Sequence, residues 1–337
     1  MAKGSILTRF GNNLYTGETS VPFVRLRKVW FTIAIILMAL SVAVPFIRGG
    51  GDFGAGFNFG IEFRGGSQFQ LSNITETDTA LAEEAVRDVV PGAEVRVTTV
   101  GDGGMRVQTE QLSDQDTREV AANLEAAYGT DDISTSFIGP SWGADITRQA
   151  LLGLAVFIGL ALIIMAIYFR TWKMSLAAIL GVAHVVVVTV GVYAATGFEI
   201  TPAAIIGFLT ILGFSLYDTV VVFDKVRENT TEMADDSPRT FSETVNLAAN
   251  QTLVRSINTA VVASLPVAAI LIIGVGLLGA DTLRDISLAL LVGTVIGAYS
   301  TPFIATPLYA LFREKEPKIA QRDKRVLALR DKAGVSA

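Results

Sequence analysis

The sequence contains no cysteine and a single histidine, His184. The missing thiols exclude disulfides and thiolate metal sites, and one imidazole is too few for a histidine-based metal centre. The chain also lacks a P-loop, a G-x-S-x-G motif and a cluster of metal-ligating residues. We therefore expect no metal or other cofactor and no ATP hydrolysis, which indicates a protein that is not an enzyme.

Charge is also scarce. Charged residues make up 18% of the 337 residues, below the roughly 25% of an average soluble domain, whereas hydrophobic residues make up 51%. This composition indicates an integral membrane protein. The net charge of −5 hides an uneven distribution of charge along the chain, and that distribution bears on topology.

Six apolar runs each come close to the ~20 residues that a helix needs to cross a hydrocarbon core of about 30 Å. They cover residues 29–47, 149–169, 174–196, 202–223, 252–277 and 285–311. The first run starts late for a signal peptide and lacks a small-residue cleavage site before Gly49, so we expect a retained anchor. The sequence therefore predicts six transmembrane helices.

Lysine is absent from residues 48–148, which hold 17 Asp or Glu and 7 Arg. Residues 1–28 and the tail 312–337, in contrast, are rich in Lys and Arg. Positive charge beside membrane helices stays in the cytoplasm. We therefore predict that both termini are cytoplasmic and that residues 48–148 form an extracytoplasmic domain.

Residues 48–148 alternate between strand and helix patterns. Predicted strands are 67–71, 95–100, 105–109 and 133–137, and predicted helices are 77–90 and 114–128. Ser113 is a typical N-cap for the second helix, and Gly129 is a typical residue at its end. The order βαββαβ indicates a ferredoxin-like α+β domain between the first two transmembrane helices.

Two further patterns concern the membrane part. Residues 225–250, between the fourth and fifth runs, have an amphipathic pattern that predicts a cytoplasmic connector at the membrane surface. Gly293 and Gly297 form a G-x-x-x-G pattern in the last run, which favours close packing of helices.

Asp218 lies within the fourth run, where a carboxylate costs roughly 2.5–3.5 kcal/mol at the centre of a bilayer. Because the fourth run leads inward and the fifth leads outward, Arg255 is expected at a similar depth and is the predicted ion-pair partner. Two interpretations stay open: a proton site whose occupancy changes as helices move, or a static salt bridge that sets helix register. Asp224 and Glu228, nearer the inner end, are expected to contact water.

Two other titratable residues lie in or beside the runs. His184, in the third run, could relay protons, but the favoured interpretation is a neutral, hydrogen-bonded core histidine. Glu199, between the third and fourth runs, is interpreted as an outer-loop charge.

Four segments resemble the SecD/SecF family of protein-export membrane proteins. Residues 58–66 (NFGIEFRGG) resemble the family's G-hydrophobic-D-F-x-G-G motif, in which Gly60, Phe63, Gly65 and Gly66 match and Glu62 replaces the usual aspartate. Residues 213–229 resemble the family's fourth span, 250–259 the start of its fifth span and 293–305 its last span. The matching side chains are Asp218, Asp224, Arg227, Asn229, Gln251, Thr252, Arg255 and Asn258.

This resemblance implies one half of an RND-type transporter body and a subunit that uses the proton-motive force to assist protein export across the bacterial cytoplasmic membrane. It implies SecD as partner, together with the SecYEG translocon, YajC-like and YidC-like proteins, the translocating polypeptide and membrane lipid, without nucleic acid. It also implies that Asp218 and Arg255 belong to a proton pathway. The alternatives are an RND-like exporter of small molecules or lipids, and a passive scaffold.

Overall fold

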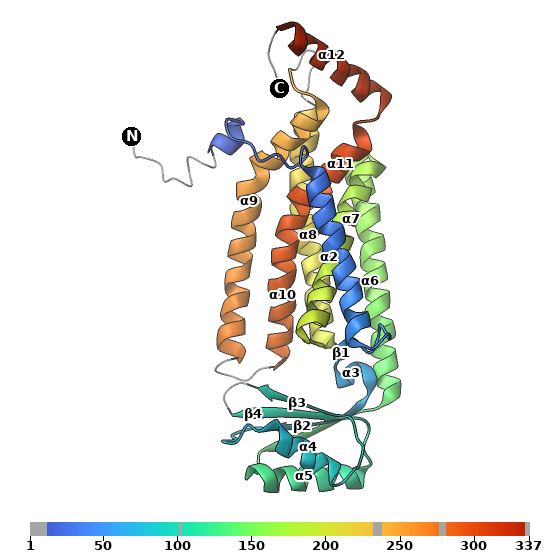
Figure 1. The fold of residues 1–337 in the computed structure, drawn as a ribbon, viewed down its shortest axis with the longest axis vertical. Helices are drawn as coiled ribbons and strands as arrows, with labels where there is room; N and C mark the ends of the chain where they lie inside the picture. The colour runs from blue at the N-terminus through green and yellow to red at the C-terminus, as the bar shows by residue number, and fades with distance from the viewer. Residues whose placement is uncertain (1–11, 101–102, 232–237, 276–280, 334–337) are drawn as a thin grey trace, which may run out of the picture.

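The protein is an elongated bundle of long helices with an α+β domain at one end and a final helix across the other end (Figure 1). A computed structural model describes residues 12–100, 103–231, 238–275 and 281–333. Six helices in these ranges are long and apolar enough to cross a membrane, in agreement with the prediction. Residues 276 and 277 of the fifth predicted run lie outside the described residues.

The membrane bundle consists of α2, α6, α7, α8, α9 and α10, and the last of these continues into α11. Their bounds are Arg27–Arg48 (α2), Pro140–Phe169 (α6), Trp172–Thr196 (α7), Pro202–Thr231 (α8), Phe241–Ile270 (α9), Asp281–Ser300 (α10) and Thr306–Arg313 (α11). The π-helical turns Leu271–Val275 (η1) and Thr301–Ala305 (η2) follow α9 and α10. Each of the first four predicted runs lies in one helix, the described part of the fifth lies in α9 and η1, and the sixth covers parts of α10, η2 and α11. Helices α6, α8 and α9 extend well beyond their runs.

The predicted connector 225–250 is not a separate surface element. Its first residues complete α8 and its last residues begin α9, while 232–237 lie outside the described residues. A capping box starts α9, because the Thr240 side chain accepts from the Glu243 N–H and the Glu243 side chain accepts from the Thr240 N–H. Phe241 and Val245 are buried among neighbouring helices. The apolar side chains Phe241 and Val245 of the amphipathic pattern therefore contact protein.

The basic tail also forms a helix, α12 (Pro317–Ala333), at the end of the bundle opposite the α+β domain (Figure 1). The Asp323 carboxylate accepts from the Phe241 N–H at 3.0 Å, which satisfies a free donor at the start of α9. Arg330 forms a salt bridge of 2.6 Å with Glu243. Residues that the sequence pattern left without structure therefore hold the first turn of α9 in place.

The α+β domain has the predicted ferredoxin-like order. Its elements are β2 (Gly66–Leu71), α4 (Thr79–Arg87), β3 (Val95–Val100), β4 (Gly104–Thr109), α5 (Asp114–Tyr128) and β5 (Ile133–Ile138). The antiparallel sheet has the order β3-β4-β2-β5. Ser113 caps α5 by accepting from the Asp116 N–H, and Gly129 ends it with a φ of 64°. One face of the sheet packs on α4 and α5 around Phe69 and Leu124.

The other face of the sheet is polar and faces the helical bundle (Figure 1). Side chains alternate between the faces of a strand, so Gln68, Arg96, Arg106 and Gln108 share this face. The connection to the bundle is made by β1 (Asn58–Phe59), α3 (Ile61–Arg64) and β6 (Glu199–Ile200), of which β1 and β6 pair in parallel. We call these three elements the joint.

Helices α8 and α10 approach each other closely at glycine residues. A Cβ added to Gly293 would lie 2.5 Å from Cγ2 of Ile211, which is too close for any real contact. At Gly297 an added Cβ would lie 3.5 Å from the Cβ of Ser215, an ordinary contact distance. Gly207, which no sequence pattern marked, is as restricted as Gly293, because its added Cβ would lie 2.6 Å from the Cβ of Ala289.

Candidate functional site

Asp218 lies on α8 inside the helical bundle, with 9% of its surface exposed. Its Oδ1 accepts a hydrogen bond of 2.7 Å from the hydroxyl of Ser256 on α9. Its Oδ2 is buried and has no hydrogen-bond partner among the described residues. The carboxyl group is therefore held through one oxygen, and the other oxygen can accept a proton.

The predicted ion pair between Asp218 and Arg255 is not formed. Both residues are described, and no salt bridge or hydrogen bond joins them; the guanidinium acts on the carboxylate only through space. Successive residues of an α-helix point about 100° apart. Because Ser256 takes the position that faces Asp218, Arg255 is exposed on the surface of α9. Chain direction predicted the depth of Arg255 but could not predict the rotation of its helix.

Small hydroxyl side chains gather near Asp218 at the contact of α8, α9 and η2. Thr219 donates to the carbonyl oxygen of Ser215 at 2.9 Å. The hydroxyl oxygens of Thr219 and Thr301 are 3.0 Å apart, and either hydroxyl can donate in this pair. Thr301 is the first residue of the π-helical turn η2, and such turns are frequent at functional sites. The carboxyl group of Asp218 therefore lies near hydroxyl groups that can both donate and accept hydrogen bonds.

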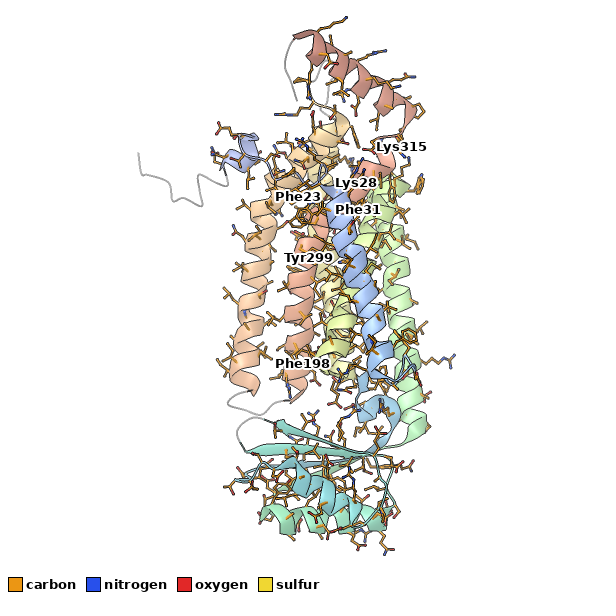
Figure 2. The ribbon with its side chains drawn as sticks, in the orientation of Figure 1. Phe23, Lys28, Phe31, Phe198, Tyr299 and Lys315 are labelled. Atoms are coloured by element: carbon orange, nitrogen blue, oxygen red, sulfur yellow. The ribbon has the colours of Figure 1, made fainter. Side chains whose placement is uncertain are left out.

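His184 on α7 is almost fully buried and shares a hydrogen bond through its Nε2 with the hydroxyl of Tyr299 on α10. Figure 2 shows Tyr299 about halfway along the bundle. The other ring nitrogen, Nδ1, is buried without a partner in the described part of the chain. This arrangement corresponds to a hydrogen-bonded core histidine on the α7–α10 contact.

Charged residues gather near the C-terminal end of α8, where Asp224, Arg227 and Glu228 are exposed and Lys225 is half-buried. Asp224 accepts from the Tyr168 hydroxyl at 3.3 Å, and Arg227 donates to the Tyr168 carbonyl oxygen at 3.4 Å. Lys225 and Glu228 form a salt bridge of 2.5 Å. These side chains bind the end of α8 to α6 and lie apart from the buried Asp218.

Three of the polar residues on α9 that match the family motif have different surroundings. Gln251 accepts from the side chain of Asn229 at 2.8 Å, which ties α9 to α8. Thr252 is buried and donates to the Ala248 carbonyl oxygen at 2.9 Å within its own helix. Asn258 is exposed, on the same helix as the exposed Arg255. The structure therefore brings Asn229 and Gln251 together and leaves Asn258 at the surface.

Glycines allow the tight turns of the joint. Gly65 and Gly66 have φ angles of 76° and 143°, which favour glycine. A Cβ at Gly66 would lie 2.3 Å from the carbonyl oxygen of Thr109, and a Cβ at Gly60 would lie 2.2 Å from Oε2 of Glu62. Gly66 thus permits the close approach of β2 to the backbone at Thr109, and Gly60 leaves room for the side chain of Glu62.

Glu199 is not a simple outer-loop charge, which corrects its interpretation from sequence. Its Oε2 accepts from Nη1 of Arg106 at 2.8 Å, and its Oε1 accepts from Nε2 of Gln108 at 2.7 Å. The ion pair with Arg106 is largely shielded from solvent. Both partners come from strand β4, far away in the sequence, so no local pattern could reveal them. This contact attaches the sheet to the segment that leads into α8.

Glu62 lies beside Glu199 in the joint. Burial raises the pKa of the Glu62 carboxyl group and the nearby Glu199 raises it further, whereas a backbone hydrogen bond and Arg106 act in the opposite direction. Its Oε2 is buried and has no hydrogen-bond partner among the described residues. Phe63, the next residue, packs on the apolar cluster around β1 and β6. The joint therefore holds a carboxyl group that retains a proton more readily than an exposed glutamate does.

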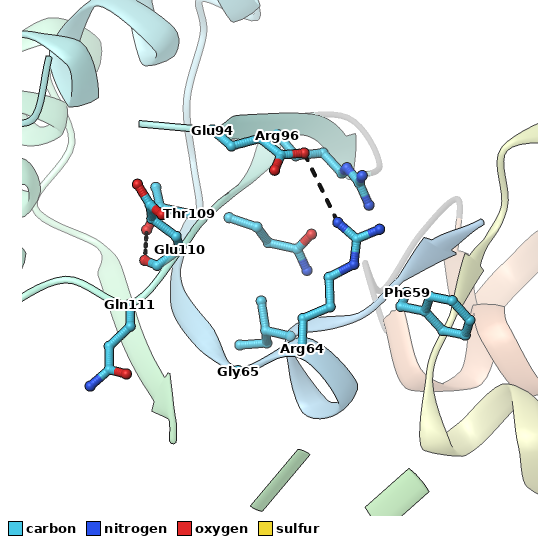
Figure 3. A pocket seen from close by; sticks show the side chains of 10 residues that line it. Phe59, Arg64, Gly65, Glu94, Arg96, Thr109, Glu110 and Gln111 are labelled. Carbon is cyan, nitrogen blue, oxygen red and sulfur yellow. Dashed lines mark hydrogen bonds and ion pairs between the residues drawn. The ribbon is translucent and has the colours of Figure 1, made fainter. Parts of the chain in front are cut away.

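A cavity of about 180 Å³ borders the joint (Figure 3). It lies between Arg64 and Gly65 on one side and the strand residues Arg96 and Thr109 on the other. The nearest charges are weakly paired, since Nη1 of Arg64 lies 4.0 Å from Oε1 of Glu94. The sheet and α3 are thus not packed continuously at this point.

Two family models match the chain. Residues 119–315 match the model described as "Protein export membrane protein SecD/SecF, C-terminal", and residues 53–72 match the "SecD/SecF GG Motif". The first match includes Asp218 and Arg255, and the second includes β1, α3 and the glycines of the joint.

Curated relatives agree with these matches. The protein translocase subunit SecF of Streptomyces coelicolor is 44% identical over 335 residues, which cover 97% of this chain and 86% of the relative. The protein translocase subunit SecF of Mycobacterium tuberculosis is 38% identical over 334 residues, which cover 96% of this chain and 74% of the relative.

The fold is also similar to a solved structure, the crystal structure of SecDF, a translocon-associated membrane protein, from Thermus thermophilus. The TM-score is 0.75 with 30% sequence identity, and the match covers 88% of this chain. The chain spans 39% of that longer protein. Because the export-family model covers more than half of the chain and close relatives align over almost all of it, the chain belongs to the SecD/SecF family, with SecF proteins as its relatives.

Proposed function

We propose that this chain is an accessory subunit of Sec-dependent protein export, in which Asp218 binds and releases protons that the proton-motive force drives across the membrane. The observation that carries the proposal is the carboxyl group of Asp218, which is buried between α8 and α9 with one oxygen unpartnered among the described residues. A buried ionisable group in a membrane helix is costly, which favours a functional role. The export role also accords with the name translocase subunit carried by the SecF relatives.

The proton cycle uses two partners on α9. Ser256 binds Asp218 in the present arrangement, in which the guanidinium of Arg255 is not in contact with the carboxyl group. Rotation of α9 by one residue step exchanges Ser256 for Arg255, because adjacent residues lie about 100° apart on a helix. An arginine at contact distance stabilises the ionised carboxylate, and its withdrawal favours protonation. Helix movement and proton occupancy are coupled in this way.

The movement reaches the α+β domain through α8. This helix carries Asp218 and begins at Pro202, directly after β6. Glu199 of β6 is bound to Arg106 and Gln108 of the sheet. A shift of α8 therefore pulls on the sheet at the joint, and the α+β domain acts as a lever on polypeptide that emerges from the membrane. Both termini are cytoplasmic in this proposal, and the α+β domain lies outside the cytoplasmic membrane, as the charge distribution predicts.

SecD is the expected partner, since the similar solved protein carries SecD and SecF in one longer chain of which this chain spans 39%. The exposed Arg255 and Asn258 lie on a transmembrane helix, where polar groups prefer protein to lipid. We assign this face of α9 to the contact with SecD. The SecYEG translocon, YajC-like and YidC-like proteins and the translocating polypeptide are further partners in the proposal. Protons supply the energy for the chain's work, and nucleotide hydrolysis has no part in it.

Proton conductance in vesicles that contain this chain and its SecD partner tests the proposal. We expect Asp218→Asn to abolish conductance and the stimulation of export. Asp224→Asn is the matched control, because it removes an exposed carboxylate from the same helix and should leave both activities intact. Wild-type conductance in an assembled Asp218→Asn complex would contradict the proton role of Asp218. Asp218 would then be a structural residue, and the chain would be interpreted as a passive scaffold.

A further inference from the structure

A basic cavity of about 810 Å³ lies at the end of the bundle opposite the α+β domain. The segment before α2, the start of α2, the start of α9 and the helix α12 contribute to its walls. Its charged lining comprises Arg25, Arg27, Lys28, Arg239, Arg330, Glu243 and Glu314. The volume falls within the range of about 300–1,000 Å³ that small-molecule sites occupy.

The carboxylates in this cavity are already neutralised. Glu314 accepts two hydrogen bonds from Arg27, at 2.5 Å and 2.9 Å. Glu243 accepts two from Arg330, at 2.6 Å and 2.8 Å. Arg25 and Lys28, which also line the cavity, form no ion pair among the described residues. A ligand of this cavity must therefore be an anion.

The cavity lies at the boundary of a membrane-spanning segment. Arg27 begins the span Arg27–Arg48, and Glu314 directly follows the span that ends at Arg313. Figure 2 shows Lys28 at the end of α2 that points away from the sheet. Leu26 and Val29, which alternate with the basic residues, are large apolar side chains that are exposed. Cationic groups thus lie next to apolar groups that suit an acyl chain.

We propose that this cavity binds the phosphate-bearing headgroup of an anionic phospholipid. Arg25 and Lys28, both exposed, would contact the phosphate oxygens, and Leu26 and Val29 would contact the first part of the acyl chains. Arginine and lysine are the side chains that bind phosphate best. Basic pockets between membrane helices on the cytoplasmic side recognise such headgroups. An acidic polypeptide would satisfy the charge but not the exposed apolar side chains of Leu26 and Val29, which adjoin the basic residues in the chain.

A bound headgroup would join elements that are distant in sequence. The walls come from the segment around Ser20, the start of α2, the start of α9 and α12. Lipid in the cavity would therefore hold the first turn of α9 against α2. The proposal concerns residues apart from Asp218 and its neighbours, so it stands or falls independently of the proton role.

Native mass spectrometry of the full chain with its partner, released from vesicles, measures retained lipid directly. The probes are phosphatidylglycerol and phosphatidylcholine in equal amounts, with inorganic phosphate as a competitor. We expect selective retention of phosphatidylglycerol, with binding roughly 30-fold weaker after the double change Arg25→Gln and Lys28→Gln, since each lost cation near the surface removes a similar share of the attraction. Millimolar inorganic phosphate should not displace the lipid.

The matched control is the double change Lys318→Gln and Lys324→Gln. It removes the same charge from exposed positions of α12 that do not line the cavity, and it should leave retention almost unchanged. An equal loss in both double variants would show attraction to the whole basic surface and overturn the site. Displacement by inorganic phosphate would overturn the assignment to lipid. The change Lys28→Arg keeps the charge and should preserve binding, so an unfolded variant cannot be mistaken for a loss of the site.

Discussion

Ser256 on α9 donates a hydrogen bond of 2.7 Å to Oδ1 of Asp218 on α8. This bond is the direct side-chain link that the structure gives to a carboxyl group whose other oxygen has no partner in the described part of the chain. It joins two helices that the proposed cycle moves relative to each other.

Removal of the Ser256 hydroxyl should destabilise the protein. In Ser256→Ala the Oδ1 of the buried Asp218 carboxyl group loses its hydrogen-bond donor, and Oδ2 already lacks one among the described residues, which costs about 1–3 kcal/mol. We expect a lower unfolding temperature and impaired proton conductance. Thermal unfolding in detergent and conductance in vesicles check this result. Asn258→Ala, a change at an exposed position on the same helix, is the control and should unfold like the wild type. Equal unfolding temperatures for both variants would mean that the bond contributes nothing.

Replacement of Arg255 should abolish proton conductance with little change in the stability of the protein. Arg255 is exposed and is not paired with Asp218, so Arg255→Gln should change the free energy of unfolding by less than about 0.5 kcal/mol. Conductance should nevertheless be lost, because the proposed cycle needs the guanidinium at the carboxylate. Arg227→Gln, at an exposed position at the end of α8, should keep conductance. A loss of stability of about 3–5 kcal/mol in Arg255→Gln would instead reveal a buried ion pair.

The stability of the joint should depend on pH through Glu62. Its pKa is raised in the folded protein, above the ordinary value of 4.5, first by burial. Between these two values the folded state binds more protons than the unfolded state, so stability is greatest at low pH and falls as pH rises through this window. Hydrogen exchange in β2 and β4, measured from acidic to neutral pH, should show this loss of protection.

Glu62→Gln should flatten that pH dependence and protect the joint at neutral pH, because the amide carries no charge to bury. Glu76→Gln, at an exposed position of the same domain, is the control and should retain the wild-type profile. A Glu62→Gln profile that still falls with rising pH would assign the effect to another group, and the neighbouring Glu199 would be the first to test.

The two glycines of α10 should respond differently to a methyl group. Gly293→Ala brings a Cβ to 2.5 Å from Ile211, and overpacking of this kind typically costs about 1–3 kcal/mol. Gly297→Ala meets Ser215 at 3.5 Å and should cost little. Unfolding temperatures compare the two directly. Adding Ile211→Val to Gly293→Ala should recover part of the loss, and a Gly297→Ala variant as unstable as Gly293→Ala would contradict the packing described.

Much of the architecture follows from local sequence. The six spans follow from the length of their apolar runs, because a helix must be long enough to cross the bilayer whatever surrounds it. The ferredoxin-like domain follows from alternation and caps, such as Ser113 before α5 and Gly129 after it. The motif at 58–66 and the segments around Asp218 and Arg255 indicate the family through residue types in order.

Local sequence patterns do not predict contacts between segments that are distant in the chain. Glu199 binds Arg106 and Gln108, which lie about ninety residues earlier in the chain, and no pattern in the sequence around Glu199 indicates these partners. The helix α12 binds the start of α9 through Asp323 and Arg330, although its composition resembles a basic tail. Such pairs form because the topology brings their elements together. The sequence of either segment alone therefore does not predict them.

The sequence by itself determined the number of candidate spans, the order of the α+β domain and the place of Asp218 within the fourth span, because each depends on residues close together in the chain. Only the tertiary structure decided that Ser256, and not Arg255, faces Asp218. An apolar helix surrounded by apolar material can turn about its axis without a change in its own pattern. Its rotation is selected by close contacts with its neighbours, which in this bundle include Gly293 against Ile211 and Gly207 against Ala289.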